Sequence, residues 1–109
     1  MHTCILCHRL VVKSITRPSI DHWRPLVVMA NPKSGGKDGE FVLSSFRKLL
    51  NPIQVIDLSE TPPENGLEIC RMLEELHCRV LVCGGDGTVG WVLSTLDKLQ
   101  LPVRYDYYS

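Results

Sequence analysis

Three short apolar runs, each followed by a stretch with helical periodicity, dominate residues 24–100 of the chain. The runs cover Leu26–Ala30, Ile53–Leu58 and Arg79–Cys83, and each is partly β-branched. Short continuous apolar runs are typical of strands that are buried on both faces of a parallel sheet. We therefore predict three buried strands at these positions.

The stretches between and after the runs place apolar residues at helical spacing. One helix is predicted over residues 38–50 and ends at Asn51-Pro52, a second follows Thr61-Pro62-Pro63-Glu64, which matches a capping box, and a third begins near Thr88. Their apolar faces are Val42, Phe46, Leu49 and Leu50 in the first helix, Ile69, Met72, Leu73 and Leu76 in the second, and Val89, Val92, Leu93 and Leu96 in the third.

The resulting β-α-β-α-β-α order predicts an α/β fold, a Rossmann-like three-layer arrangement with helices on both faces of a parallel sheet. Residues 1–23 have no clean period and are expected to form an irregular leader. The tail, residues 101–109, is too short to add another strand and helix unit. The third strand is therefore expected to leave an open sheet edge, where a protein partner could dock.

Composition narrows the class of protein without identifying it. The 109 residues include 12 Lys and Arg against 12 Asp and Glu, so the chain has no net field to attract nucleic acid. A basic nucleic-acid-binding domain is excluded on this ground. No apolar run approaches the roughly 18 to 20 residues that a membrane span needs. The length allows one small domain.

The odd number of cysteines, five, argues against a closed disulfide framework, and so does their placement. Cys70 and Cys83 lie in apolar patterns, which favours reduced, buried thiols in an intracellular protein. Cys4 and Cys7 form a lone C-x-x-C motif beside histidines. A structural zinc site needs four ligands, usually in two pairs, and no second pair follows. A flexible leader, or a remnant of an upstream cysteine-rich module, is favoured over zinc, and no protein metal site is predicted.

Two glycine-rich loops carry the candidate chemistry. Asn31–Gly36 follows the first predicted strand, and Gly84–Thr88 follows the third. Ligands of parallel α/β sheets bind outside the carboxyl ends of the strands, and a helix N-terminus offers N–H groups and partial positive charge to phosphate. A single loop of this kind is often only a turn, but two at one sheet edge favour a nucleotide site. On spacing alone, Thr61 and Asp86 could instead be helix caps.

Known phosphate motifs fit only in part. No Walker loop occurs, and Gly85–Gly90 satisfies G-x-G-x-x-G after a strand. The dinucleotide fingerprint also requires an acidic residue at the end of the next strand. That acidic residue is expected about 20 positions after the glycine motif. Asp106 lies at about this distance, but in a tyrosine-rich tail for which no strand is predicted.

The two loops together resemble a known family. Asn31-Pro32-Lys33-Ser34-Gly35-Gly36, followed by Val82-Cys83-Gly84-Gly85-Asp86-Gly87-Thr88-Val89-Gly90-Trp91-Val92, is similar to the catalytic domain of eukaryotic diacylglycerol kinases. The resemblance covers about residues 24–100. The wider superfamily includes sphingosine, ceramide, bacterial lipid and NAD kinases, and Gly90-Trp91-Val92 favours diacylglycerol kinase among them.

This resemblance implies ATP- and Mg²⁺-dependent transfer of the γ-phosphate to diacylglycerol, which gives phosphatidic acid in lipid signalling. It also implies a cytoplasmic protein that works peripherally at a membrane surface. Asp86 would be the catalytic residue, in related lipid kinases the proposed base for the acceptor hydroxyl. The nucleotide would contact Asn31, Pro32, Lys33, Ser34, Gly35, Thr61, Gly84, Gly85, Gly87 and Thr88.

In the family the catalytic unit continues into a further strand, a G-T-G-N-D loop and a mostly β second domain. The resemblance therefore implies that residues 24–100 are the N-terminal half of the catalytic domain, followed by an atypical tail. Such a truncated segment is expected to be incomplete and inactive alone. An NAD-kinase-like nucleotide-binding module and a non-catalytic partner fragment remain alternatives.

Overall fold

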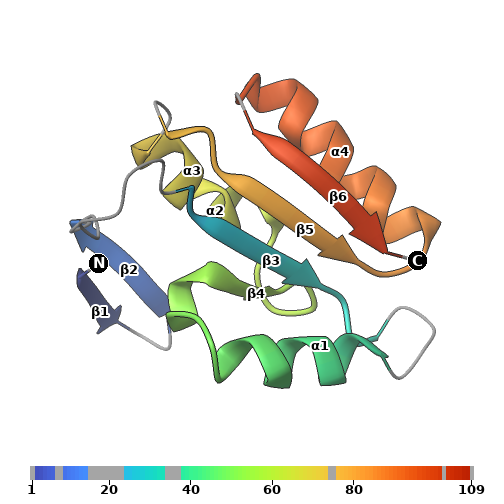
Figure 1. The fold of residues 1–109 in the computed structure, drawn as a ribbon, viewed down its shortest axis with the longest axis horizontal. Coiled ribbons are helices and arrows are strands. Elements are labelled where there is room, and N and C mark those ends of the chain that lie inside the picture. Colours follow the sequence, from blue (N-terminus) through green and yellow to red (C-terminus); the bar gives the residue numbers. More distant parts are fainter. Residues whose placement is uncertain are drawn as a thin grey trace.

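A parallel four-stranded sheet in the order β4-β3-β5-β6 forms the centre of the protein (Figure 1). The computed structural model describes residues 2–6, 9–14, 24–33, 38–73, 76–101 and 103–108. The strands of this sheet are β3 (Leu26–Ala30), β4 (Val55–Asp57), β5 (Arg79–Cys83) and β6 (Arg104–Tyr108). The helices are α1 (Asp38–Arg47), the 3₁₀ turn η1 (Pro52–Gln54), α2 (Pro63–Gly66), α3 (Glu68–Met72) and α4 (Asp86–Leu99).

Alternate strand residues face two separate apolar clusters, one on each side of the sheet. Val27, Met29, Val80 and Val82 pack with apolar residues of α3 and α4. Ala30, Val55 and Cys83 pack instead against α1, which buries Leu43. Because helices cover both faces of a parallel sheet, the predicted α/β three-layer fold is confirmed.

The fourth strand is a correction to the sequence prediction. The tail was expected to add no strand, yet β6 pairs in parallel with β5, from Arg79 opposite Arg104 to Cys83 opposite Tyr108. The crossover between the two strands is α4 itself. A strand at the edge of a sheet needs no continuous apolar run, so charged residues in the tail do not prevent pairing. The open edge therefore lies on β6 rather than on the third strand.

A second difference lies near the N-terminus, where no regular element was predicted. There β1 (His2–Leu6) and β2 (Arg9–Ser14) pair as an antiparallel hairpin. The pair Val11-Val12 gives β2 the β-branched character that suits a strand. Cys7 lies outside the described residues, and only the backbone of Cys4 is described, so the zinc question stays untested.

The first helix has the predicted start and packs on the predicted side of the sheet. Val42, Phe46 and Leu50 contact its apolar cluster, as expected. Leu49 was assigned to the same face wrongly, because it is 77% exposed, whereas Leu43 is 2% exposed. The buried face runs through Leu43 and Leu50, which are seven residues apart, and Leu49 lies about 100° away from Leu50 around the helix axis, so it faces solvent.

The second predicted helix is divided into α2 and α3 at Leu67, whose φ and ψ are −84° and 1°. Pro62 is the N-cap of α2 and makes no side-chain capping bond, so the capping box predicted at Thr61 is wrong. The break changes the phase of the apolar face. Ile69 and Leu73 are buried as predicted, but Met72 is 40% exposed.

The second predicted strand is shorter than its apolar run. Pro52–Gln54 form the 3₁₀ turn η1, in which Asn51 accepts a hydrogen bond from the N–H of Ile53 and Gln54 accepts one from the N–H of Asn51. Only Val55–Asp57 pair with β3. The three described cysteine side chains, Cys70, Cys78 and Cys83, are free and buried, as predicted. In the described part of the chain, no helix is long and apolar enough to cross a membrane.

Candidate functional site

The sheet order creates one position where the direction of chain crossover reverses. From β3 the chain crosses to β4 on one side, and then returns past β3 to β5 on the other side. β3 and β5 are therefore neighbours whose following connections lead to opposite sides. In open α/β sheets ligands bind at such a switch point, outside the carboxyl ends of the strands.

The two glycine-rich loops begin at this switch point. Ala30 and Cys83, the last residues of β3 and β5, lie opposite each other in the parallel register. The N–H of Asn31 donates a hydrogen bond to the carbonyl oxygen of Cys83 at 3.4 Å. The predicted proximity of the loop starts is thus present in the structure. Ser34 and Gly35, also predicted as site residues, lie outside the described residues.

The described part of the first loop is a tight turn. The N–H of Lys33 donates to Oδ1 of Asn31 at 3.0 Å, and Pro32 lies between them. The start of α1 packs directly against this turn at Gly39. A Cβ atom on residue 39 would lie 2.8 Å from Cα of Pro32 and 2.9 Å from the carbonyl oxygen of Asn31. Gly39 was not recognised from the sequence, because close backbone approach leaves no periodic signal.

The second loop depends on glycine at position 84. Gly84 has φ of +156°, and a Cβ atom there would lie 2.8 Å from both Cβ and Cγ2 of Thr88. Thr88 is 5% exposed, so its side chain is enclosed near this turn. A predicted site residue, Thr88, therefore supports the loop from within.

The start of α4 has no side-chain cap. Gly85 is the N-cap residue, and its carbonyl oxygen accepts from the N–H of Val89 at 3.0 Å. The alternative that Asp86 caps the helix is therefore wrong, because Asp86 is the first helical residue and is exposed. Gly87 is also exposed, and apart from its chain neighbours and the backbone of its own helix, no heavy atom lies within 4 Å of the position that a Cβ atom would take. The N-terminal turn of a 14-residue helix is thus open to an anion.

Thr61 lies beyond the carboxyl end of β4, at the same edge of the sheet. Its N–H donates to the carbonyl oxygen of Asp57 at 2.9 Å. The Asp57 carboxylate accepts from the N–H and the hydroxyl of Ser59 at 2.9 and 2.6 Å. Leu58 in turn donates to the carbonyl oxygen of Ala30, which ties this loop to the end of β3. Thr61 therefore shares the edge with the two glycine-rich loops, on the β4 side.

Asp38 is a further charged residue at this edge that the sequence did not single out. Burial raises the pKa of the Cys83 thiol, and the negative charge of Asp38 raises it further. α1, which begins at Asp38, also contacts β5. Within the described residues, no group of three or more His, Cys, Asp or Glu side chains could hold a metal ion.

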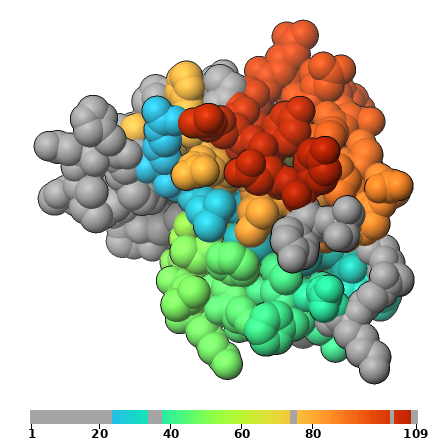
Figure 2. Space-filling model, turned by 45° about the vertical axis from the view of Figure 1, so that its right-hand side comes forward, coloured from blue at the N-terminus to red at the C-terminus, as the bar shows by residue number. Residues whose placement is uncertain are grey.

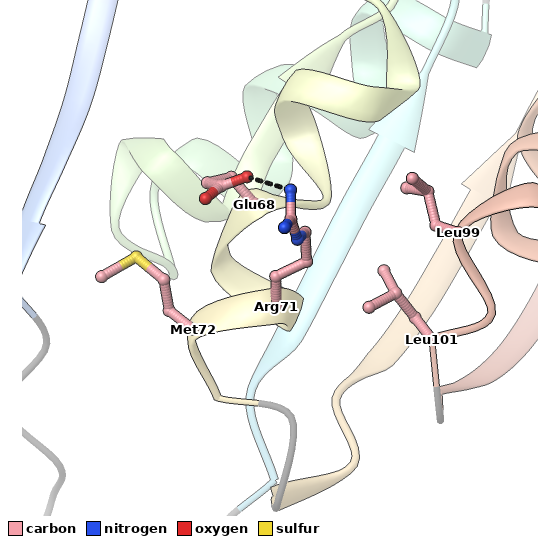
Figure 3. A pocket seen from close by; sticks show the side chains of 5 residues that line it. All are labelled: Glu68, Arg71, Met72, Leu99 and Leu101. Atoms are coloured by element: carbon pink, nitrogen blue, oxygen red, sulfur yellow. Dashed lines mark ion pairs between the residues drawn. The ribbon is translucent and has the colours of Figure 1, made fainter.

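Away from the glycine-rich loops, a hollow of about 410 Å³ lies between α3 and the C-terminal end of α4 (Figure 3). Met72, Leu99 and Leu101 line it, together with Glu68 and Arg71, which form an exposed ion pair at 3.5 Å. α4 begins at the glycine-rich loop and ends at this hollow, so the two features lie at opposite ends of the helix. The hollow contains none of the predicted site residues.

The sequence is similar to known proteins along most of its length. The family profile described as diacylglycerol kinase catalytic domain matches residues 25–105. Probable diacylglycerol kinase 3 of Caenorhabditis elegans is 52% identical over 95 residues, which are 87% of this chain and 12% of that protein. Human diacylglycerol kinase iota is 53% identical over 91 residues, 84% of this chain and 8% of that protein.

The eye-specific diacylglycerol kinase of Drosophila melanogaster is 50% identical over 94 residues, 86% of this chain and 6% of that protein. This chain therefore spans between 6% and 12% of the length of these three relatives. The family match reaches residue 105, which lies within β6. No solved structure matches the chain.

Proposed function

Because the chain belongs to the diacylglycerol kinase catalytic domain family, we propose that it forms the nucleotide-binding part of an ATP-dependent lipid kinase. The reaction is transfer of the γ-phosphate of ATP to the hydroxyl of diacylglycerol, which yields phosphatidic acid and ADP. One observation carries the proposal: the two glycine-rich loops begin side by side at the switch point, joined by the Asn31–Cys83 hydrogen bond.

Backbone N–H groups are the proposed phosphate ligands. The second loop, Gly84–Thr88, contributes the uncapped start of α4, where N–H groups and the helix dipole favour negative charge. The open space above Gly87 allows phosphate oxygens to approach the backbone. In the first loop, the N–H groups of Asn31 and Lys33 already donate within the protein and Pro32 has none, so the proposed phosphate ligands there are the N–H groups of Ser34 and Gly35. Thr61 is proposed to border the nucleotide from the β4 side.

Asp86 is the proposed catalytic residue. Its exposed side chain stands in the first turn of α4, beside the proposed phosphate position. The lipid hydroxyl oxygen attacks the γ-phosphorus, the bond to the β,γ-bridging oxygen breaks, and ADP leaves. The Asp86 carboxylate orients the hydroxyl and accepts its proton. Phosphoryl transfer depends mainly on positioning and charge neutralisation. Phosphate binding by the loops and orientation of the hydroxyl by Asp86 are therefore the main contributions that we propose for this chain.

Mg²⁺ is proposed to enter with the nucleotide. The described residues contain no metal cluster of their own, which fits an ion held mainly by phosphate oxygens, water and one or two carboxylates. Asp86 is the carboxylate within the Gly84–Thr88 loop. When bound, Mg²⁺ would neutralise charge on the phosphates.

Diacylglycerol is a membrane lipid, so we propose that the kinase works peripherally at a membrane surface. The chain spans at most 12% of the relatives named above, and we propose that it does not transfer phosphate by itself. Residues from a longer polypeptide would complete the lipid side of the cleft.

Nucleotide binding by the 109-residue chain tests the proposal. Isothermal titration should detect ATP, and NAD should compete far more weakly. Gly87→Asp should abolish binding, because a carboxylate would occupy the open space and repel phosphate. The matched control is Gly90→Asp, at an equally open and exposed glycine one turn further along α4, which should retain binding. Equal loss in both variants, or preference for NAD, would refute the proposal.

A further inference from the structure

β6 is the last strand in the sheet order, so no other strand in the described part of the chain pairs with the backbone groups of its outer edge. Figure 2 shows β6, in red, at the surface of the molecule. On its inner side, the N–H of Arg104 donates to the carbonyl oxygen of Cys78 at 3.1 Å. Backbone groups alternate in direction along a strand, so those of Tyr105 and Tyr107 point away from β5. Such an edge is a template for another strand.

The side chains of β6 differ between the two faces of the sheet. Tyr105 and Tyr107 share a face with their register partners Val80 and Val82, and are 49% and 60% exposed. Beside Tyr105 lies a hollow of about 290 Å³ between β6 and α4, lined in part by Leu93, Leu101 and Val103. This apolar face of the edge is thus only partly covered.

The opposite face of β6 is charged. Arg104 and Asp106 lie there, two residues apart, in register with Arg79 and Leu81. Asp106 makes one long ion pair, 3.9 Å from Arg79, and its side chain is 73% exposed. Tyr105 is therefore flanked by one positive residue, Arg104, and one negative residue, Asp106.

We propose that β6 pairs antiparallel with β6 of a second copy of this chain, about a two-fold axis at Tyr105. Tyr105 then faces Tyr105 of the second copy, as a pair that exchanges both backbone hydrogen bonds. Arg104 faces Asp106 of the second copy, and Asp106 faces its Arg104. A two-fold interface repeats each contact, so two ion pairs form.

Among the registers that join outward-pointing residues, this one alone sets Arg104 against Asp106 of the second copy. Pairing must join outward-pointing residues, so the next register would place Tyr105 opposite Tyr107 of the second copy. That shift sets Asp106 directly against Asp106, which is unfavourable for like charges. The proposed register also places Tyr107 opposite Val103 of the second copy, a residue that directly precedes β6 and whose N–H already donates to the carbonyl oxygen of Leu101 at 2.9 Å. On the apolar face of the proposed dimer, the residues opposite each other across the axis are therefore Val103 and Tyr107, Tyr105 and Tyr105, and Tyr107 and Val103.

Sedimentation velocity over a concentration series tests the dimer. The wild-type chain should dimerise with concentration, and Arg104→Asp or Asp106→Arg should each raise the dissociation constant about tenfold or more, since each change affects two cross-strand pairs. The double variant should recover dimerisation, because it exchanges the two charges and also leaves Arg79 a carboxylate partner. Arg71→Asp reverses another exposed charge, on α3, and should have no effect.

Cross-linking tests the register separately. Directly opposite residues of a hydrogen-bonded antiparallel pair have Cα atoms about 5.5 Å apart, within disulfide range. With Cys4 and Cys7 changed to Ser and diamide as oxidant, Tyr105→Cys should give a disulfide-linked dimer. Tyr107→Cys should not, because the two thiols would be separated by about 13 Å along the strands.

Each outcome bears directly on the proposal. Dimerisation, charge-reversal loss, recovery in the double variant and cross-linking at position 105 support it. A chain that stays monomeric at every soluble concentration overturns it. So does a dimer that is insensitive to both charge reversals, or cross-linking at position 107 in preference to 105. Circular dichroism spectra identify any variant that fails to fold. If a single variant does not fold, the sedimentation results for the wild-type chain and the double variant decide whether the proposal holds.

Discussion

Gly84 and Thr88 approach each other so closely that no side chain fits between them. A Cβ atom on residue 84 would lie 2.8 Å from Cβ and Cγ2 of Thr88, and the φ of Gly84 is +156°. Both restrictions act at the turn between β5 and α4. The turn that aims the start of α4 at the proposed phosphate therefore requires glycine for two independent reasons.

Gly84→Ala should lower the free energy of unfolding by about 1–3 kcal/mol, because it adds backbone strain and a close contact. Urea denaturation measures this change. The control is Gly90→Ala, where the added Cβ meets open space inside the same helix. That variant should be unchanged or more stable by about 0.5–1 kcal/mol. Equal effects at the two positions would show that the turn tolerates a side chain.

Gly39→Ala should disturb the first loop. The new methyl group would press on backbone atoms of Asn31 and Pro32, which cannot move aside as a flexible side chain can. We expect destabilisation of about 1–3 kcal/mol and weaker ATP binding. Thermal unfolding and calorimetric titration measure the two effects. Stability and affinity both at wild-type values would contradict the inferred support of the loop by α1.

Asp86→Asn should separate chemistry from folding. Asp86 is exposed, so stability should change by no more than about 0.5 kcal/mol. ATP should bind at least as tightly, since a negative charge near the phosphates is removed. In a full-length diacylglycerol kinase carrying this sequence, phosphatidic acid formation should fall about 10²- to 10⁴-fold. Near-normal product formation by the variant would contradict the assigned role.

Stability should decline in alkaline solution partly through Cys83. Its pKa is raised in the folded state, by burial and then by Asp38, above the ordinary 9.0. As pH rises past the unfolded value, the unfolded chain loses a proton that the folded chain retains, so the free energy of unfolding falls. The slope from this thiol is at most about 1.4 kcal/mol per pH unit.

Cys83→Ala removes the titrating thiol and should therefore flatten this decline between about pH 8 and 10. Denaturant titrations at each pH measure the slopes, and the comparison of slopes is independent of any constant loss of stability. Asp38→Asn should have a smaller effect in the same direction. Identical slopes in the wild-type chain and Cys83→Ala would show that Cys83 ionises equally in both states.

The interior strands could be predicted from sequence, and the edge strand could not. β3 and β5 have the predicted bounds, because strands covered on both faces must be apolar throughout. β6 alternates charged residues with tyrosines and has one unpaired side. β6 forms because it pairs with β5, and the pattern of residues in Arg104–Tyr108 alone does not predict this pairing.

The helix boundaries, like the strands, could be predicted where the local residue pattern determines them and not where packing against other elements does. α4 follows a regular apolar stripe and was predicted within two residues at its start. Leu49 was misplaced because the buried face of this segment runs through Leu43 and Leu50 and not through Leu49. The division between α2 and α3 coincides with close packing of Gly66, where a Cβ atom would lie 2.8 Å from Cγ1 of Ile56.

The candidate site was predictable where it follows from parallel topology. Loops that leave neighbouring parallel strands must share an edge, and the Asn31–Cys83 hydrogen bond confirms that they do. The contributions of Gly39 and Asp38 come from the angle at which α1 returns to the sheet. That angle is set by packing of Leu43 on Ala30 and Val55, which sequence spacing does not specify.

Backbone amide chemical shifts during an ATP titration test the central claim most directly. The account predicts that the largest shifts in a ¹⁵N–¹H spectrum of the chain belong to Asn31–Gly35, apart from Pro32, and to Gly84–Thr88. Residues around Arg71 and Leu99, at the other end of α4, should stay in place. Saturating ATP that leaves both loops unchanged, or that shifts mainly the hollow near Arg71, would contradict it.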